Sequence, residues 1–173
     1  MKKINFALIY TMAFMLCLSN IAGAQKFDVA LNYPFFSPFE KMGFKGNNAN
    51  DFNIKAVRDF VKTFKTVDNN RWSLAEDGSA ASTFTSDGIK TRVAYDRKGY
   101  RRYILKVYKE NKLSDDIRHM VKREYYDATI TLIKELETND GLVIYVHMQD
   151  KGTWKIVSIA DGEMKLVENF NKG

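Results

Sequence analysis

The chain is poor in three residue types that often carry structure or chemistry: cysteine, proline and histidine. Its 173 residues include one cysteine, two prolines and two histidines. A single cysteine excludes a disulfide within the chain. His119 and His147 fall in different segments, and neither has a second ligand at metal-binding spacing. The sequence therefore predicts neither a metal site nor a cofactor.

Blocks of like charge are also missing. The chain has 27 basic and 21 acidic residues, a formal net charge of +6, and they are interspersed. Proteins that bind nucleic acid usually gather basic residues on one face or helix. No nucleic-acid partner is expected.

The N-terminus has the pattern of an export signal. Lys2 and Lys3 precede an apolar run from Ile4 to Leu18, which is shorter than the roughly 20 residues of a membrane-spanning helix. Ala22-Gly23-Ala24 supplies the small residues that a signal peptidase accepts. We therefore predict a signal peptide over 1–24, a mature chain from Gln25, a periplasmic or secreted location and no stable membrane insertion.

A lipid anchor at Cys17 is the alternative for this terminus. The preceding Phe14-Met15-Leu16 lacks the small residues expected before a lipid-modified cysteine, which favours soluble export. Removal of 24 residues leaves 149, a length typical of one domain. The mature chain loses two basic residues and no acidic one, so its net charge is +4.

Residues 25–50 form an aromatic-rich segment without periodicity. It contains both prolines, Pro34 and Pro38, which disfavour a helix interior or a central strand. We expect an extended arm that packs on the domain or on a partner. Its aromatic residues are Phe27, Tyr33, Phe35, Phe36, Phe39 and Phe44.

From residue 51 the pattern alternates between helix and hairpins. Ile54, Val57, Phe60, Val61 and Phe64 have the spacing of an amphipathic helix. A second helix is expected over 114–124, where Ser114 is a capping residue. Each helix precedes four short β-rich segments separated mostly by Asp-Gly turns, a strong hairpin signal. The expected strands are 71–75, 80–85, 90–95, 100–108, 129–137, 142–149, 153–160 and 163–170.

This order predicts an α+β domain over 51–173. It consists of tandem helix-plus-four-strand units (51–110 and 111–173) that form a curved antiparallel sheet with the helices on one face. In the first unit Trp72, Phe60, Phe64, Tyr103 and Leu105 should form the core. The structural alternative is a lipocalin-like barrel around a small apolar or glycan ligand.

The stretch from about 56 to 170 contains a series of short motifs. They are Val57-Arg58-Asp59-Phe60, Trp72, Ala80 to Phe84, Val93-Ala94-Tyr95-Asp96 with Gly99, Leu113-Ser114, Tyr125-Tyr126-Asp127, Ile144-Tyr145-Val146 and Asp161-Gly162-Glu163-Met164. In these motifs and their order the stretch resembles the β-lactamase-inhibitor-like, PepSY-like family of secreted bacterial proteins. The resemblance implies the tandem fold and a protein-binding or inhibitor-like role, and it brings no catalytic residues.

Catalytic chemistry has little support in the sequence. The acidic pair Asp115-Asp116 is explained by capping and by the helix dipole, because both residues fall in a first helical turn. Glycines occur singly in turns and not in a phosphate-binding loop. We predict a protein that is not an enzyme.

A binding surface is predicted instead on the sheet face turned away from the helices. From strand alternation we expect Tyr103, Leu105 and Val107 under the helices, with their neighbours on the opposite face. Tyrosine and arginine often anchor protein interfaces. The expected partner is an unknown envelope or extracellular protein, and the alternative is that these side chains only cover the sheet. The candidate residues are Tyr100, Arg102, Lys106, Tyr108, Tyr145 and His147.

Overall fold

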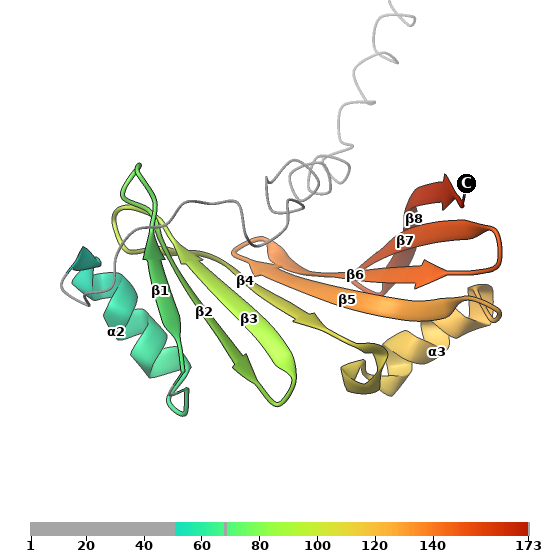
Figure 1. Ribbon diagram of the computed structural model, residues 1–173, viewed down its shortest axis with the longest axis horizontal. Helices are drawn as coiled ribbons and strands as arrows, with labels where there is room; N and C mark the ends of the chain where they lie inside the picture. Colours follow the sequence, from blue (N-terminus) through green and yellow to red (C-terminus); the bar gives the residue numbers. More distant parts are fainter. Residues whose placement is uncertain (1–50, 68, 173) are drawn as a thin grey trace, which may run out of the picture. The chain divides into compact units, whose positions relative to one another are not determined.

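The computed structural model describes residues 51–67 and 69–172, so the predicted signal peptide and aromatic arm lie outside the described residues. Each of the two main helices is followed by four strands (Figure 1), as the sequence predicted. The first set is α2 (Ile54–Thr63), β1 (Arg71–Leu74), β2 (Ala80–Ser86), β3 (Ile89–Tyr95) and β4 (Arg101–Tyr108). The second is η4 (Glu110–Lys112), α3 (Asp115–Glu124), β5 (Thr129–Thr138), β6 (Gly141–Gln149), β7 (Thr153–Ala160) and β8 (Glu163–Asn171).

The eight strands form one antiparallel sheet in sequence order from β1 to β8. Among the described strands, β1 pairs with β2 alone and β8 with β7 alone. The sheet is therefore open, which confirms the α+β class and makes the barrel alternative wrong. A barrel would require its first and last strands to pair.

Both helices pack on the same face of the sheet. Ala56 and Phe60 of α2 form a core with Val93 of β3 and Ile104 of β4. Val121 of α3 belongs to a second core that includes strand residues such as Tyr108, Ile133 and Val146. The two cores lie on the same face of the sheet, because Ile104 of the first core and Tyr108 of the second lie an even number of residues apart on β4.

The first core is aromatic. The Phe60 ring centroid lies 5.3 Å from that of Trp72 and 5.8 Å from that of Phe84, both in edge-to-face geometry. Phe64 packs on Phe60 and Phe84. The prediction that Phe60, Phe64 and Trp72 belong to one core under α2 is therefore confirmed. The buried face of α2 is narrower than predicted, since Ile54 and Val61 are 61% and 60% exposed.

Tyr103 and Leu105 were wrongly expected in this core. Leu105 pairs with Arg92, and Tyr103 pairs with Ala94, on the sheet face opposite Phe60. Ile104, 5% exposed, takes the place under α2. The misassignment arose because β4 is an inner strand with large apolar side chains on both faces, so alternation alone does not identify its covered face.

Tight turns join the strands as expected. Asp87 and Gly88 have φ values of 49° and 75°, and Asp161 and Gly162 have 52° and 78°. Two consecutive residues in the left-handed region characterise the hairpin turn whose twist suits antiparallel strands. These turns set the register between β2 and β3 and between β7 and β8.

The start of α2 is fixed by contact with the β3–β4 turn. The Asn53 side chain accepts from the Lys55 amide at 3.0 Å and donates to the Arg97 carbonyl at 3.2 Å. Gly99 lies so close that a Cβ there would be 2.7 Å from Asn53 Oδ1. Ser114 occupies the equivalent cap of α3, but its side chain makes no capping hydrogen bond. Neither described helix is long and apolar enough to span a membrane.

Candidate protein-binding face

The face opposite the helices follows from the register of the strand pairs. We call it the open face and define it by the side chains that share it on successive strands. On β1 to β4 these are Arg71, Ser73, Ala81, Thr83, Thr85, Lys90, Arg92, Ala94, Tyr103, Leu105 and Val107. On β5 to β8 they are Leu132, Lys134, Leu136, Thr138, Val143, Tyr145, His147, Gln149, Trp154, Ile156, Ser158, Ala160, Glu163, Lys165, Glu168 and Phe170.

The structure divides the six predicted binding residues instead of bringing them together. Tyr145 and His147 lie on the open face, as expected. Lys106 and Tyr108 lie on the helix face, where Tyr108 is 6% exposed. Their expected place on the face away from the helices is therefore wrong.

Contacts with β5 explain the orientation of Lys106 and Tyr108. Lys106 Nζ lies 2.5 Å from Glu135 Oε1, and the Tyr108 hydroxyl donates to Glu135 Oε2 at 3.0 Å. Burial, followed by the charge of Glu135, raises the pKa of Tyr108 well above its usual value. Lys106 and Tyr108 can therefore lie on the covered face of the sheet, because the carboxylate of Glu135 on the neighbouring strand binds both polar groups.

Tyr100 and Arg102 lie beside the irregular start of β4. Tyr100 precedes the strand and is 55% exposed, and Lys55 Nζ lies 3.3 Å from its ring centroid. Arg102 is exposed. It lies at a register shift between β3 and β4, where Ala94 pairs with Tyr103 but Tyr95 pairs with Arg101. The shift removes Arg102 from the ladder, so alternation does not assign it to either face.

The centre of the open face is closely packed. Tyr145 is 3% exposed, and burial raises its pKa. His147 beside it is partly buried, and its pKa is lowered to about 4, first by burial and then by the positive charge of Lys134. Its Nε2 atom is buried without a hydrogen-bond partner among the described residues. The imidazole is therefore neutral at pH 7.

Two exposed aromatic side chains flank that centre, and the sequence did not single them out. Trp154 on β7 pairs with Phe170 on β8 and is 44% exposed, while Phe170 is 54% exposed. Lys172 Nζ lies 4.9 Å from the Trp154 ring centroid. Trp154 also pairs with Gln149 of β6, which lies on the open face, so Trp154 and Phe170 lie on that face too. Strand alternation over 153–160 could have placed Trp154 with Ile156 and Ser158, but the register shift opposite Ile156 and Val157 hides Phe170 from the same argument.

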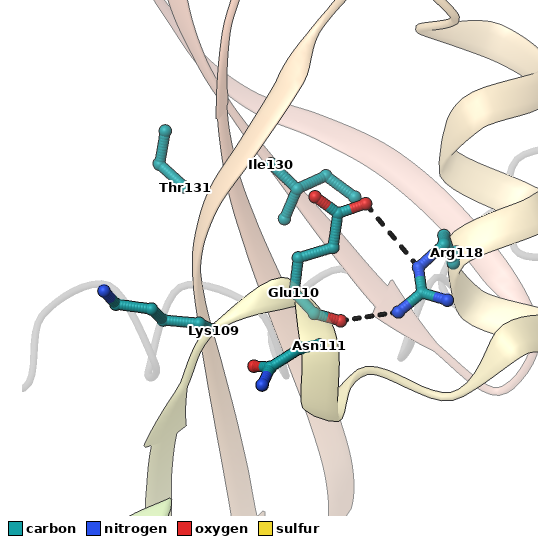
Figure 2. Close-up of a pocket in the computed structure, with 6 residues that line it drawn as sticks. All are labelled: Lys109, Glu110, Asn111, Arg118, Ile130 and Thr131. Atoms are coloured by element: carbon teal, nitrogen blue, oxygen red, sulfur yellow. Dashed lines mark hydrogen bonds and ion pairs between the residues drawn. The ribbon is translucent and has the colours of Figure 1, made fainter. Parts of the chain in front are cut away.

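Two hollows lie around the connection from β4 to α3. One of about 350 Å³ is lined by apolar Val107 and Leu132 together with Lys109 and Lys112. The other, of about 490 Å³, is lined by Lys109, Glu110, Asn111, Arg118, Ile130 and Thr131 (Figure 2).

Arg118 in the larger hollow holds the connection against α3. Its guanidinium donates to the Glu110 carbonyl at 2.6 Å and lies 3.5 Å from the Glu110 carboxylate (Figure 2). It also lies 3.0 Å from the carboxylate of Asp115. Acidic partners already surround this charge, so the arrangement is a structural clamp. Within the described part of the chain, no group of three or more histidine, cysteine or acidic side chains is placed to hold a metal ion.

No family model and no curated protein matches the chain. The chain is, however, similar in fold to solved structures of proteins from Bacteroides species. A BLIP-like protein of Bacteroides fragilis has a TM-score of 0.55 at 12% identity, over 69% of this chain and 86% of that one. A DUF2874 family protein of Bacteroides ovatus has a TM-score of 0.55 at 14% identity, over 73% and 89%. A presumed periplasmic protein of Bacteroides eggerthii has a TM-score of 0.53 at 11% identity, over 69% and 88%.

At such identities the likeness concerns the fold. The open sheet with tandem helices is the architecture that the resemblance in the sequence implied. The chain thus has the fold of the BLIP-like and DUF2874 family structures.

Proposed function

We propose that this chain is an exported, non-enzymatic binding protein that holds another protein of the envelope or the extracellular space on its open face. The observation that carries the proposal is the exposed aromatic pair Trp154 and Phe170 on the face that α2 and α3 leave uncovered. Exposed tryptophan and phenylalanine are costly to leave in water and are enriched at the centres of protein interfaces.

The surroundings of the pair suit a protein partner better than a small ligand. Lys172 and Gln149 provide polar groups beside the rings, connected by a 3.2 Å hydrogen bond. An apolar anchor with a polar rim is the usual anatomy of a protein interface. The hollows near Lys109 lie on other strands and are lined by other residues.

Export is supported by the signal pattern over 1–24 and by the fold shared with a presumed periplasmic protein. An inhibitor-like role is supported by the fold shared with a BLIP-like protein.

Affinity capture with matched variants tests the proposal. The mature chain and a Trp154→Ala/Phe170→Ala double variant are used as baits in envelope extract, and retained proteins are quantified by mass spectrometry. The control bait carries Ile54→Ala and Val61→Ala, which remove comparably exposed apolar side chains from α2. We expect a specific partner to be lost with the open-face variant and kept with the control. Equal retention by all baits would contradict the proposal.

A further inference from the structure

We propose that the protein forms a symmetric dimer in which the edge strand β8 pairs antiparallel with β8 of a second copy. The inference goes beyond the proposed function, because it concerns the edge of the sheet and not its open face. β8 ends the sheet and pairs with β7 alone among the described strands (Figure 1). An unpaired strand edge is a template on which another strand can add through backbone hydrogen bonds.

The two edges of the sheet differ in what they offer to a second strand. β1 has four residues, whereas β8 has nine. Proline, which would remove a backbone donor from an edge, is absent from β8. Two large apolar side chains of β8 are also about half exposed, Leu166 at 51% and Phe170 at 54%. β8 is therefore the edge with the longer and more apolar surface for pairing.

A bulge gives β8 a distinctive pattern of faces. Val157 pairs with Leu166 and Ile156 pairs with Glu168, so Val167 is an extra residue in the strand. At such a bulge two consecutive residues oppose one residue of the neighbouring strand. Leu166 and Val167 therefore both oppose Val157, which belongs to the core on the helix face. The regular alternation of faces along β8 is broken between these two residues.

The pattern of faces is the same in both directions from this break. The faces are the open face at Lys165 and Glu168, the helix face at Met164 and Asn169, and the open face at Glu163 and Phe170. A second copy that runs antiparallel therefore matches β8 face for face in one register, and a shift by one residue puts open-face side chains opposite helix-face ones. A regular strand has no such break and matches β8 on one side of the bulge only. The pattern thus favours a second copy over a strand of another protein.

The register that matches the faces also brings compatible side chains together. Leu166 lies opposite Val167 of the second copy, so the pairing covers a leucine that is half exposed in the monomer. Lys165 lies opposite Glu168 of the second copy and keeps its pair with Glu163 of its own strand, at 3.2 Å. Each contact occurs twice, as two-fold symmetry requires. Apolar pairs and pairs of opposite charge across strands stabilise a sheet, whereas like charges directly opposite destabilise it.

The dimer joins the open faces of the two copies, because matched faces keep both sets of side chains on one side of the sheet. Each copy contributes its own Trp154 and Phe170 to this surface. Loss of the dimer leaves both aromatic side chains in the monomer. Capture of a partner through Trp154 and Phe170 can therefore be tested separately from pairing through β8.

Sedimentation equilibrium of the mature chain, at about 1 µM to 1 mM, measures the dimer. The single variants Lys165→Glu and Glu168→Lys each put like charges opposite one another in the proposed register, and the double variant restores opposite charges in exchanged places. The pair with Glu163 is present in monomer and dimer alike, so its loss does not alter the affinity between copies. We expect each single variant to weaken dimerisation by at least about fivefold and the double variant to return to within about twofold of the parent.

Matched charge reversals far from the edge are the controls. Lys62→Glu and Glu76→Lys change the net charge by the same amounts at exposed positions of α2 and the β1–β2 turn. They should leave the dimer within about twofold of the parent. A second measurement applies if a charge variant does not fold. Leu166→Cys should form a disulfide between two copies on mild oxidation, and Tyr126→Cys, at a position that is 82% exposed, should not.

Four results would overturn the inference: a parent that is monomeric throughout, single variants that behave like their controls, a double variant no better than the single ones, or equal crosslinking of the two cysteine variants. A monomeric protein that still captures a partner through Trp154 and Phe170 would sink this inference and leave the proposed function standing.

Discussion

The Tyr108 hydroxyl donates a 3.0 Å hydrogen bond to Glu135 Oε2, linking the last residue of β4 to the middle of β5. This contact lies on the helix face, at the edge of the core that α3 covers. It identifies which side of β4 faces the helices, and with it which side of the whole sheet the two helices leave uncovered.

Replacing Tyr108 by alanine should therefore impair folding. The side chain is 6% exposed, and truncating a large buried aromatic costs about 3–5 kcal/mol. Tyr100→Ala is the matched control, since that ring is 55% exposed and its contact with Lys55 is worth about 0.5–1 kcal/mol. Urea denaturation measures both. Similar midpoints for the two variants would mean that the face of β4 is assigned wrongly.

Phe60→Ala should also lower the free energy of unfolding by about 3–5 kcal/mol, because it empties the centre of the aromatic cluster under α2. Val61→Ala, one position along the helix and 60% exposed, should stay within about 0.5 kcal/mol of the parent. Chemical denaturation followed by tryptophan fluorescence reports on both, since Trp72 packs against Phe60. The description of α2 fails if the Val61 variant is the less stable one.

Gly99→Ala should destabilise the protein more than Gly88→Ala. Both glycines have positive φ, +80° and +75°, which costs an alanine about 1–2 kcal/mol. At Gly99 the added Cβ would also lie 2.7 Å from Asn53 Oδ1 and 3.0 Å from the Ala56 amide nitrogen, whereas at Gly88 it would meet nothing within 4 Å. Thermal unfolding of the two variants is the measurement. A Gly99 variant as stable as the Gly88 variant would show that the turn does not support the start of α2.

His147 should make stability depend on mildly acidic pH. Burial and Lys134 lower its pKa to about 4 in the folded protein, against an ordinary value of 6.5. The unfolded chain therefore takes up this proton first as pH falls, so the contribution of the neutral imidazole is full above pH 6.5 and is lost between pH 6.5 and 4. His147→Gln should flatten the stability profile over that interval. Parallel profiles for parent and variant would be evidence against a buried neutral imidazole.

Much of the fold was predictable because its signals are local. The three- and four-residue spacing of Val57, Phe60 and Phe64 and the Asp-Gly hairpins specify helices and turns over a few residues each. The observed bounds of the strands differ from the predicted ones by one residue at most.

The faces of the strands were harder to predict, because they depend on partners far away in the sequence. Lys106 was assigned to the open face by alternation with Leu105 and Val107, but Glu135 on the next strand makes the helix face acceptable to it. Register shifts at Ala94/Tyr95, Ile130/Leu132 and Ile156/Val157 also interrupt the two-residue period. Of the six candidate residues, Tyr145 and His147 lie on the predicted face and Lys106 and Tyr108 do not, and the aromatic pair at Trp154 and Phe170 was missed.

Site-specific photocrosslinking in intact cells is the most direct test of the central claim that the open face holds a protein partner. A photoreactive phenylalanine analogue is placed at Thr85 or Phe170 on the open face and, for comparison, at Val61 on α2 or Tyr126 after α3. All four positions are exposed, so each tolerates the larger side chain. We expect a discrete crosslinked protein from Thr85 and Phe170 and none from Val61 or Tyr126. Crosslinks from the helix positions alone would contradict the claim.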